Sequence, residues 1–66
     1  MTLEQISALR WVLVDAIDIS NERRSDLSLE DAASEHADFC RIIDLVEPHD
    51  AAVADELHKQ LGEIVP

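Results

Sequence analysis

The chain has 66 residues, which is enough for one small domain and leaves no room for a second. Its 15 Asp and Glu residues against 5 Lys and Arg residues give a formal net charge of −10 at pH 7, which excludes a direct nucleic-acid binder and disfavours contact with an anionic membrane. Hydrophobic residues make up 47% of the sequence, but Trp11 and Phe39 are the only aromatic residues, so we expect a thin, aliphatic core.

The sequence carries no sign of export or of membrane insertion. No run approaches the ~20 apolar residues of a transmembrane span, and the N-terminus lacks a signal-peptide pattern. The single cysteine, Cys40, cannot form an internal disulfide. We therefore expect a cytoplasmic protein.

The first predicted helix covers residues 3–20. Thr2 and Gln5 have the spacing of a capping box, in which each residue satisfies a free backbone N–H of the other. At about 100° per residue, one broad apolar arc is predicted to face the core. It contains Leu3, Ile6, Leu9, Val12, Leu13, Ala16 and Ile17. A buried strand across residues 11–14 is the alternative, but the sequence offers it no partner strand.

Two further helices are predicted over residues 29–46 and 48–61. Ser28 is the expected N-cap of the second helix, and Pro48 is expected both to end that helix and to open the third. Gly62 is a typical stop. The apolar positions of these helices are Leu29, Ala32, Ala33, His36, Phe39, Cys40, Ile43 and Val46, then Val53, Ala54, Leu57 and Leu61. Ile64 and Val65 are expected to fold back over the core.

These segments predict an all-α fold, a compact three-helix bundle formed by a single domain over residues 1–66. Residues 21–27 form the polar connection between the first two helices. Each helix is too short to be stable alone in water, so the three helices are expected to form together.

Acidic side chains form two rows on the predicted helices. The row on the first helix falls within an arc of about 60° and also includes an aromatic residue. Its members are Glu4, Trp11, Asp15, Asp18 and Glu22, and the row on the second helix consists of Asp31, Glu35 and Asp38. Crowded carboxylates repel one another, so we expect raised carboxyl pKa values. The alternative interpretation of both rows is an ordinary solvated surface.

Trp11 allows two interpretations. An exposed tryptophan among carboxylates would be a good anchor for a protein partner, because aromatic side chains dominate many interfaces. Burial under the loop or the C-terminal residues is favoured, because so thin a core needs every large side chain.

The sequence predicts neither catalysis nor a cofactor. No residue context marks a nucleophile, and a bundle of this size has little volume for a substrate cleft. His36 and Cys40 lie one helical turn apart, but two ligands make a weak metal site, so we expect no metal. His49 and His58 are expected at the surface. We therefore expect a protein that is not an enzyme.

The length, the charge imbalance and acidic rows such as Asp15–Asp18–Glu22 and Asp31–Glu35–Asp38 resemble those of small phage anti-CRISPR proteins. Several members of that group act as DNA mimics, and this chain is similar to the short acidic helical members directed at type I Cascade, including the type I-C complex. The resemblance implies binding, in the cytoplasm of the host bacterial cell, to the DNA-entry or motif-recognition groove of the surveillance complex, and exclusion of target DNA. It transfers no individual functional residue, because the group shares no diagnostic motif.

Two hypotheses of function follow. The first is a monomeric, non-enzymatic inhibitor that binds a basic DNA-binding surface of a nucleoprotein effector by acidic mimicry of DNA. Both rows, with Trp11, are then the partner-binding residues. The second is a small helical interaction module, such as an antitoxin or a regulatory subunit, that binds through an apolar groove or through Trp11. Binding by mimicry should weaken steeply with salt, whereas binding through an apolar interface should barely change.

Overall fold

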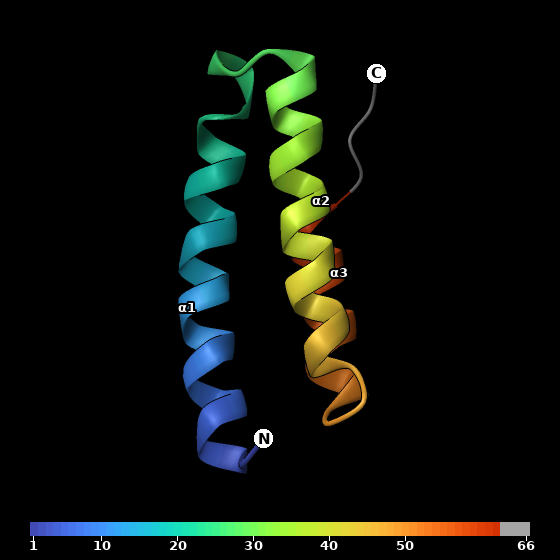
Figure 1. Cartoon of the computed structure of the whole chain (residues 1–66). Coiled ribbons are helices and arrows are strands. Elements are labelled where there is room, and N and C mark those ends of the chain that lie inside the picture. The colour runs from blue at the N-terminus through green and yellow to red at the C-terminus, as the bar shows by residue number, and fades with distance from the viewer. Residues whose placement is uncertain (63–66) are drawn as a thin grey trace.

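Three α-helices form the fold of the chain (Figure 1). In the computed structural model, which describes residues 1–62, α1 spans Leu3–Glu22, α2 spans Leu29–Val46 and α3 spans Ala51–Leu61. A single turn of 3₁₀-helix, η1, covers Arg24–Asp26 between α1 and α2. The described residues contain no strand, and the predicted all-α, three-helix bundle is confirmed. The predicted return of Ile64 and Val65 concerns positions outside the described residues.

Side-chain caps fix where the helices begin. The capping box of α1 is confirmed: Thr2 Oγ1 accepts from the Gln5 N–H at 3.1 Å, and the Thr2 N–H donates to Gln5 Oε1 at 2.8 Å. Ser28 Oγ accepts from the backbone N–H of Asp31 at 3.1 Å and opens α2 as predicted. α1 ends at Glu22, two residues beyond its predicted end.

The predicted start of the third helix at Pro48 is wrong. The chain turns after α2, where the N–H groups of His49 and Asp50 both donate to the Val46 carbonyl at 2.9 Å. Asp50 is the N-cap of α3, because its Oδ1 accepts from the Val53 N–H at 3.1 Å. The side chain of Asp50 therefore fixes the first turn of α3. Pro48 lies in the connection between α2 and α3. The predicted stop at Gly62 is confirmed, with a φ of 70° that glycine adopts without strain.

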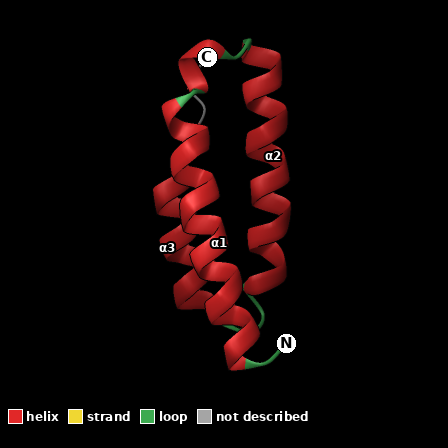
Figure 2. Cartoon of the chain, turned by 90° about the vertical axis from the view of Figure 1, so that its left-hand side faces the viewer, coloured by secondary structure: helices red, strands yellow, loops and turns green. Residues whose placement is uncertain are grey.

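The helices form an elongated bundle with dimensions of 36 × 18 × 15 Å. α2 runs antiparallel to α1, and α3 returns alongside α2, so that α1 and α3 point in the same direction (Figures 1 and 2). α3 has 11 residues, whereas α1 has 20 and α2 has 18. α3 therefore covers only part of the length of the other two helices.

The core lies where α3 meets α1 and α2. Its buried cluster consists of Leu13, Ile17, Ile43, Ala54, Leu57 and Leu61. Three large residues of the predicted apolar faces are instead exposed, Leu3 by 82%, Val12 by 64% and Leu29 by 58%, and Ala33 is exposed as well. Leu3 and Leu29 lie in the first turns of their helices at opposite ends of the bundle, and α3 is too short to cover both ends. Val12 lies on the side of α1 that faces away from α3.

Replacing Leu13 or Ile43 with alanine should lower the free energy of unfolding by about 2–5 kcal/mol, because each side chain is almost completely buried. A domain of this size has roughly 3–5 kcal/mol to lose, so these variants should be close to unfolding. Urea denaturation followed by circular dichroism measures the loss. The control is Val12→Ala, which should change the unfolding free energy by no more than about 0.5 kcal/mol. Equal effects of Leu13→Ala and Val12→Ala would show that the core face of α1 is misplaced.

Candidate functional site

The α1 acidic row consists of Glu4, Asp15, Asp18 and Glu22, which are all exposed. Each ion pair found among residues 1–62 takes its carboxylate from α2 or α3. The four carboxylates of the α1 acidic row are thus without a cationic partner in the described part of the chain. A cation of a binding partner could approach them without breaking an internal contact.

The acidic row of α2 is different, because two of its three carboxylates are already paired. Glu35 is half-buried and accepts from the Arg23 guanidinium at 2.8 and 2.9 Å. Asp38 pairs with Arg41 one turn along α2. Asp31 has no ion pair within the described residues and lies in the first turn of α2, where the helix dipole favours negative charge. The sequence could not show this difference, because Arg23 reaches Glu35 only through the path of the connecting loop.

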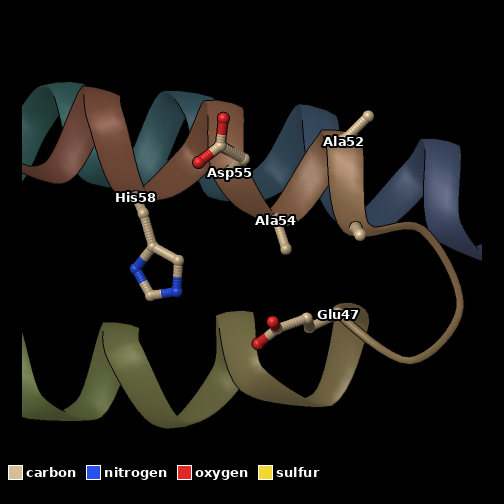
Figure 3. Close-up of a pocket in the computed structure, with 6 residues that line it drawn as sticks. Glu47, Ala52, Ala54, Asp55 and His58 are labelled. Atoms are coloured by element: carbon tan, nitrogen blue, oxygen red, sulfur yellow. The ribbon is translucent and has the colours of Figure 1, made fainter.

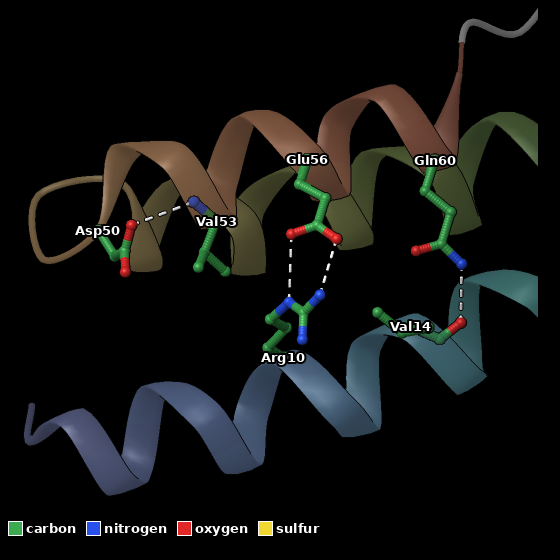
Figure 4. A network of polar contacts seen from close by, with 6 residues as sticks. All are labelled: Arg10, Val14, Asp50, Val53, Glu56 and Gln60. Carbon is green, nitrogen blue, oxygen red and sulfur yellow. Dashed lines mark hydrogen bonds and ion pairs between the residues drawn. The ribbon is translucent and has the colours of Figure 1, made fainter.

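Trp11 is 62% exposed, so the expectation that it is buried is wrong. Its neighbour Arg10 takes the position that faces α3 and forms a bidentate ion pair with Glu56, with distances of 2.8 and 3.2 Å (Figure 4). One residue further along, Trp11 is rotated by about 100° away from α3. The Arg10 guanidinium lies 5.6 Å from the centre of the indole ring, a cation–π distance. The indole is thereby supported on one side and open to a partner.

Two carboxyl groups have lowered pKa values, which is opposite to the expectation from like-charge repulsion. The pKa of Glu56 lies below its ordinary value because Arg10 donates hydrogen bonds to it and attracts its charge. The pKa of Glu35 is lowered first by a hydrogen bond with Ser20 and then by the one from Arg23. The expectation of raised values is therefore wrong for these two groups, because local pairing outweighs the repulsion of the chain's other carboxylates.

A shallow pocket of about 450 Å³ lies where α2 ends and α3 begins. Its lining residues are Glu47, Ala51, Ala52, Ala54, Asp55 and His58. His58 and Glu47 point into the space between the two helices (Figure 3). Of the polar lining residues, His58 lies 3.7 Å from Asp44 and Asp55 pairs with Lys59 at 3.1 Å.

His36 and Cys40 lie side by side on α2, as their spacing predicts. Cys40 Sγ is 3.6 Å from His36 Nδ1, and His36 Nε2 is 2.8 Å from the Gly62 carbonyl oxygen. Both ring nitrogens thus have hydrogen-bond partners, and the pair ties α2 to the end of α3. Within the part of the chain that the structure describes, no three His, Cys, Asp or Glu side chains are grouped to hold a metal ion.

Comparison with models of protein families, with curated proteins and with solved structures found no match for this chain. Among residues 1–62, none of the helices combines the length and the hydropathy that a membrane crossing requires.

Replacing Glu56 with Gln should lower the melting temperature at pH 7, and this difference from the wild type should vanish in acid. Glu56 has a folded-state pKa below its ordinary value of 4.5, so its contribution to stability is present above that pH and is lost as the pH falls through the folded-state value. Melting curves of both proteins between pH 7 and pH 3 measure the difference. Asp18→Asn removes an exposed carboxylate without an ion pair within residues 1–62 and should not lower the melting temperature at pH 7. A difference for Glu56→Gln that stays constant down to pH 3 would contradict the assigned pair.

Proposed function

We propose that this protein is a non-enzymatic inhibitor that occupies a basic, DNA-binding surface of another protein through α1. The observation that carries the proposal is the α1 acidic row, whose four exposed carboxylates lack cationic partners within residues 1–62. The arginine and lysine side chains of a DNA-binding groove pair with carboxylates much as they do with phosphates. The exposed Trp11 provides an aromatic anchor in the same surface.

The spacing of the row supports imitation of a phosphate strand. Asp15, Asp18 and Glu22 follow one another along the axis of α1 at intervals of about 4.5 and 6 Å. Phosphates of one DNA strand follow at about 3.4 Å, so this segment presents charge at a somewhat lower density than DNA. The rigid helix holds the carboxylates in place before binding, which limits the entropy lost on association.

The resemblance to acidic anti-CRISPR proteins makes a type I Cascade complex, with the type I-C form first, the partner to test. In that setting the protein binds as a monomer and competes with target DNA for the same groove. The wild-type chain should then lose affinity steeply as the salt concentration rises.

A helical interaction module, such as an antitoxin or a regulatory subunit, is the second candidate function. It is favoured by the large apolar side chains that α1 and α2 leave exposed, among them Trp11, Val12 and Leu45 at 62%, 64% and 66%. Such side chains bind through the hydrophobic effect, which responds little to moderate salt.

Reversing two charges of the α1 acidic row, Asp15→Lys with Asp18→Lys, should weaken binding to the type I-C complex by about tenfold or more, because cations of the groove would be left unpaired and newly opposed. The fold should persist, since the changes relieve like-charge repulsion on an exposed face. The matched control is Asp31→Lys with Asp38→Lys, which changes the net charge equally but alters the row that is already partly neutralised. A binding titration at two salt concentrations, with circular dichroism for folding, provides the comparison.

The proposal predicts a much smaller loss for the control pair and competition between the wild-type chain and duplex target DNA. Equal losses in both variants would show that only total charge matters. Unchanged binding in both variants, without competition by DNA, would exclude mimicry.

A further inference from the structure

Among the apolar side chains that α1 and α2 leave exposed, four lie in the middle and upper parts of the two helices. Val12 and Ile19 on α1 are 64% and 59% exposed, and Ile42 and Leu45 on α2 are 36% and 66% exposed. We refer to these four residues as the α1–α2 apolar face. Their angular positions place Val12, Ile19 and Leu45 on the side of the bundle away from α3 and turn Ile42 toward α1.

The orientation of α1 follows from its contacts with α3. Arg10 pairs with Glu56, and the Val14 carbonyl accepts from Gln60 (Figure 4). Asn21 donates to the Gln60 carbonyl. At about 100° per residue, Val12 and Ile19 lie about 140–180° around α1 from these contact positions. Both side chains therefore point away from α3.

The orientation of α2 follows in the same way. Glu35 forms its ion pair with a residue at the end of α1, whereas His36 and Asp44 contact α3 and its C-cap. Ile42 lies about 20° around α2 from Glu35, and Leu45 lies about 180° from His36. Ile42 therefore faces α1, and Leu45 faces outward on the side away from α3.

Val12 is also at a similar height along the bundle to Ile42 and Leu45, whereas Ile19 lies about 10 Å further along α1, in its last turn. Glu35 is level with the last turn of α1, because it contacts Ser20 and Arg23. α2 runs antiparallel to α1, so the next seven to ten residues of α2 descend about 10–15 Å. Ile42 and Leu45 thus lie across from the middle of α1, which contains Val12. Leu9 and Ala16, which are half-buried, lie on α1 between Val12 and the side of α1 that faces α2.

The charges around this face are negative. Asp15 borders it on α1, and Asp31 and Asp38 border it on α2. Three cations of the chain are used elsewhere: Arg10 pairs with Glu56, Arg24 donates to Asn21 and to the Leu61 carbonyl, and Lys59 pairs with Asp55. Arg23, near the top of the face, is paired with Glu35. Arg41, the cation on this part of α2, is paired with Asp38. A second copy of the chain would bring the same carboxylates and a further net charge of −10, so repulsion disfavours it as the occupant.

We propose that the α1–α2 apolar face binds a basic, amphipathic α-helix of a partner protein. The apolar stripe of that helix lies along Val12, Ile42 and Leu45, and its lysine or arginine flanks meet Asp15 and Asp31. The bound helix takes the fourth position around the bundle, on the side that α3 leaves open. This proposal rests on the second candidate function, that of a helical interaction module, and does not require DNA mimicry.

The test uses a fluorescein-labelled synthetic helix of about 18 residues, with Leu at positions i, i+3, i+4 and i+7 and Lys and Ala elsewhere. A shuffled peptide of the same composition keeps the charge but places the Leu residues on no common face. Fluorescence anisotropy measures the affinity of the wild-type chain for each peptide. The amphipathic peptide should bind at least about tenfold more tightly than the shuffled one, because only the former can bury a continuous apolar stripe.

Two double variants, each of which replaces two exposed apolar residues with serine, locate the binding site. Val12→Ser with Leu45→Ser should weaken binding of the amphipathic peptide by about tenfold or more, since it removes apolar area at the centre of the face. Leu3→Ser with Leu29→Ser is the matched control, because these residues are also exposed but lie off the face. The control should bind the peptide as the wild type does, and circular dichroism should show the same helicity in both.

Each other outcome overturns the proposal in a distinct way. Loss of binding in Trp11→Ser, with Val12→Ser/Leu45→Ser unaffected, would keep the interaction module but move its site. Equal binding of both peptides, abolished by 0.5 M salt, would reject the second candidate function and leave a purely charged surface. A wild-type dimer in sedimentation that Val12→Ser/Leu45→Ser dissociates would show that a second copy occupies the face.

Discussion

The packing of α3 into the angle between two longer helices is the interaction on which the rest of the structure depends. α3 contributes Ala54, Leu57 and Leu61 to the buried cluster, and α1 and α2 each bury their core residues against it. An 11-residue helix offers only three turns of apolar surface, so the core is confined to that length of the bundle. Beyond it, α1 and α2 must leave apolar side chains in contact with water.

The short third helix also determines which charges are neutralised. It supplies Glu56 to Arg10 and Asp55 to Lys59, and the loop that precedes α2 brings Arg23 to Glu35. With the Arg41–Asp38 pair, these contacts use four of the five Lys and Arg side chains on carboxylates of α2 and α3. The carboxylates of α1 are left without partners among residues 1–62, although α1 itself carries Arg10. The acidic surface that α1 offers to a cationic partner is therefore a consequence of how α3 and the loop before α2 pack in the bundle.

Local signals in the sequence were sufficient to predict the helices and two of their three starting points. Thr2 and Ser28 cap their helices through neighbours three residues away, an interaction that does not depend on the rest of the fold. The start of α3 was not predicted, because Pro48 is an acceptable first residue of a helix and Asp50 is an acceptable N-cap. The turn after Val46 decides between the two.

The candidate site was only partly predictable. Helical spacing placed the acidic residues in rows, but it could not show which row is neutralised, because Arg23 and Glu35 meet across a loop. The exposure of Trp11 was missed for a related reason. Composition alone favours burial of the largest side chain, whereas the Arg10–Glu56 pair fixes the rotation of α1 and turns Trp11 outward.

The exposed residues of α1 link stability to binding. Trp11, Val12 and Ile19 are each about three-fifths exposed, although only five large side chains are fully buried among residues 1–62. Covering such side chains contributes roughly 25 cal/mol for each Å² of apolar surface removed from water. A partner that binds only the folded chain adds its binding free energy to that of folding, and the gain grows with the partner's concentration. In a domain with so little core, this gain can be as large as the free energy of unfolding of the free chain. The α1 surface that the core leaves exposed is therefore the surface whose burial by a partner would stabilise the fold.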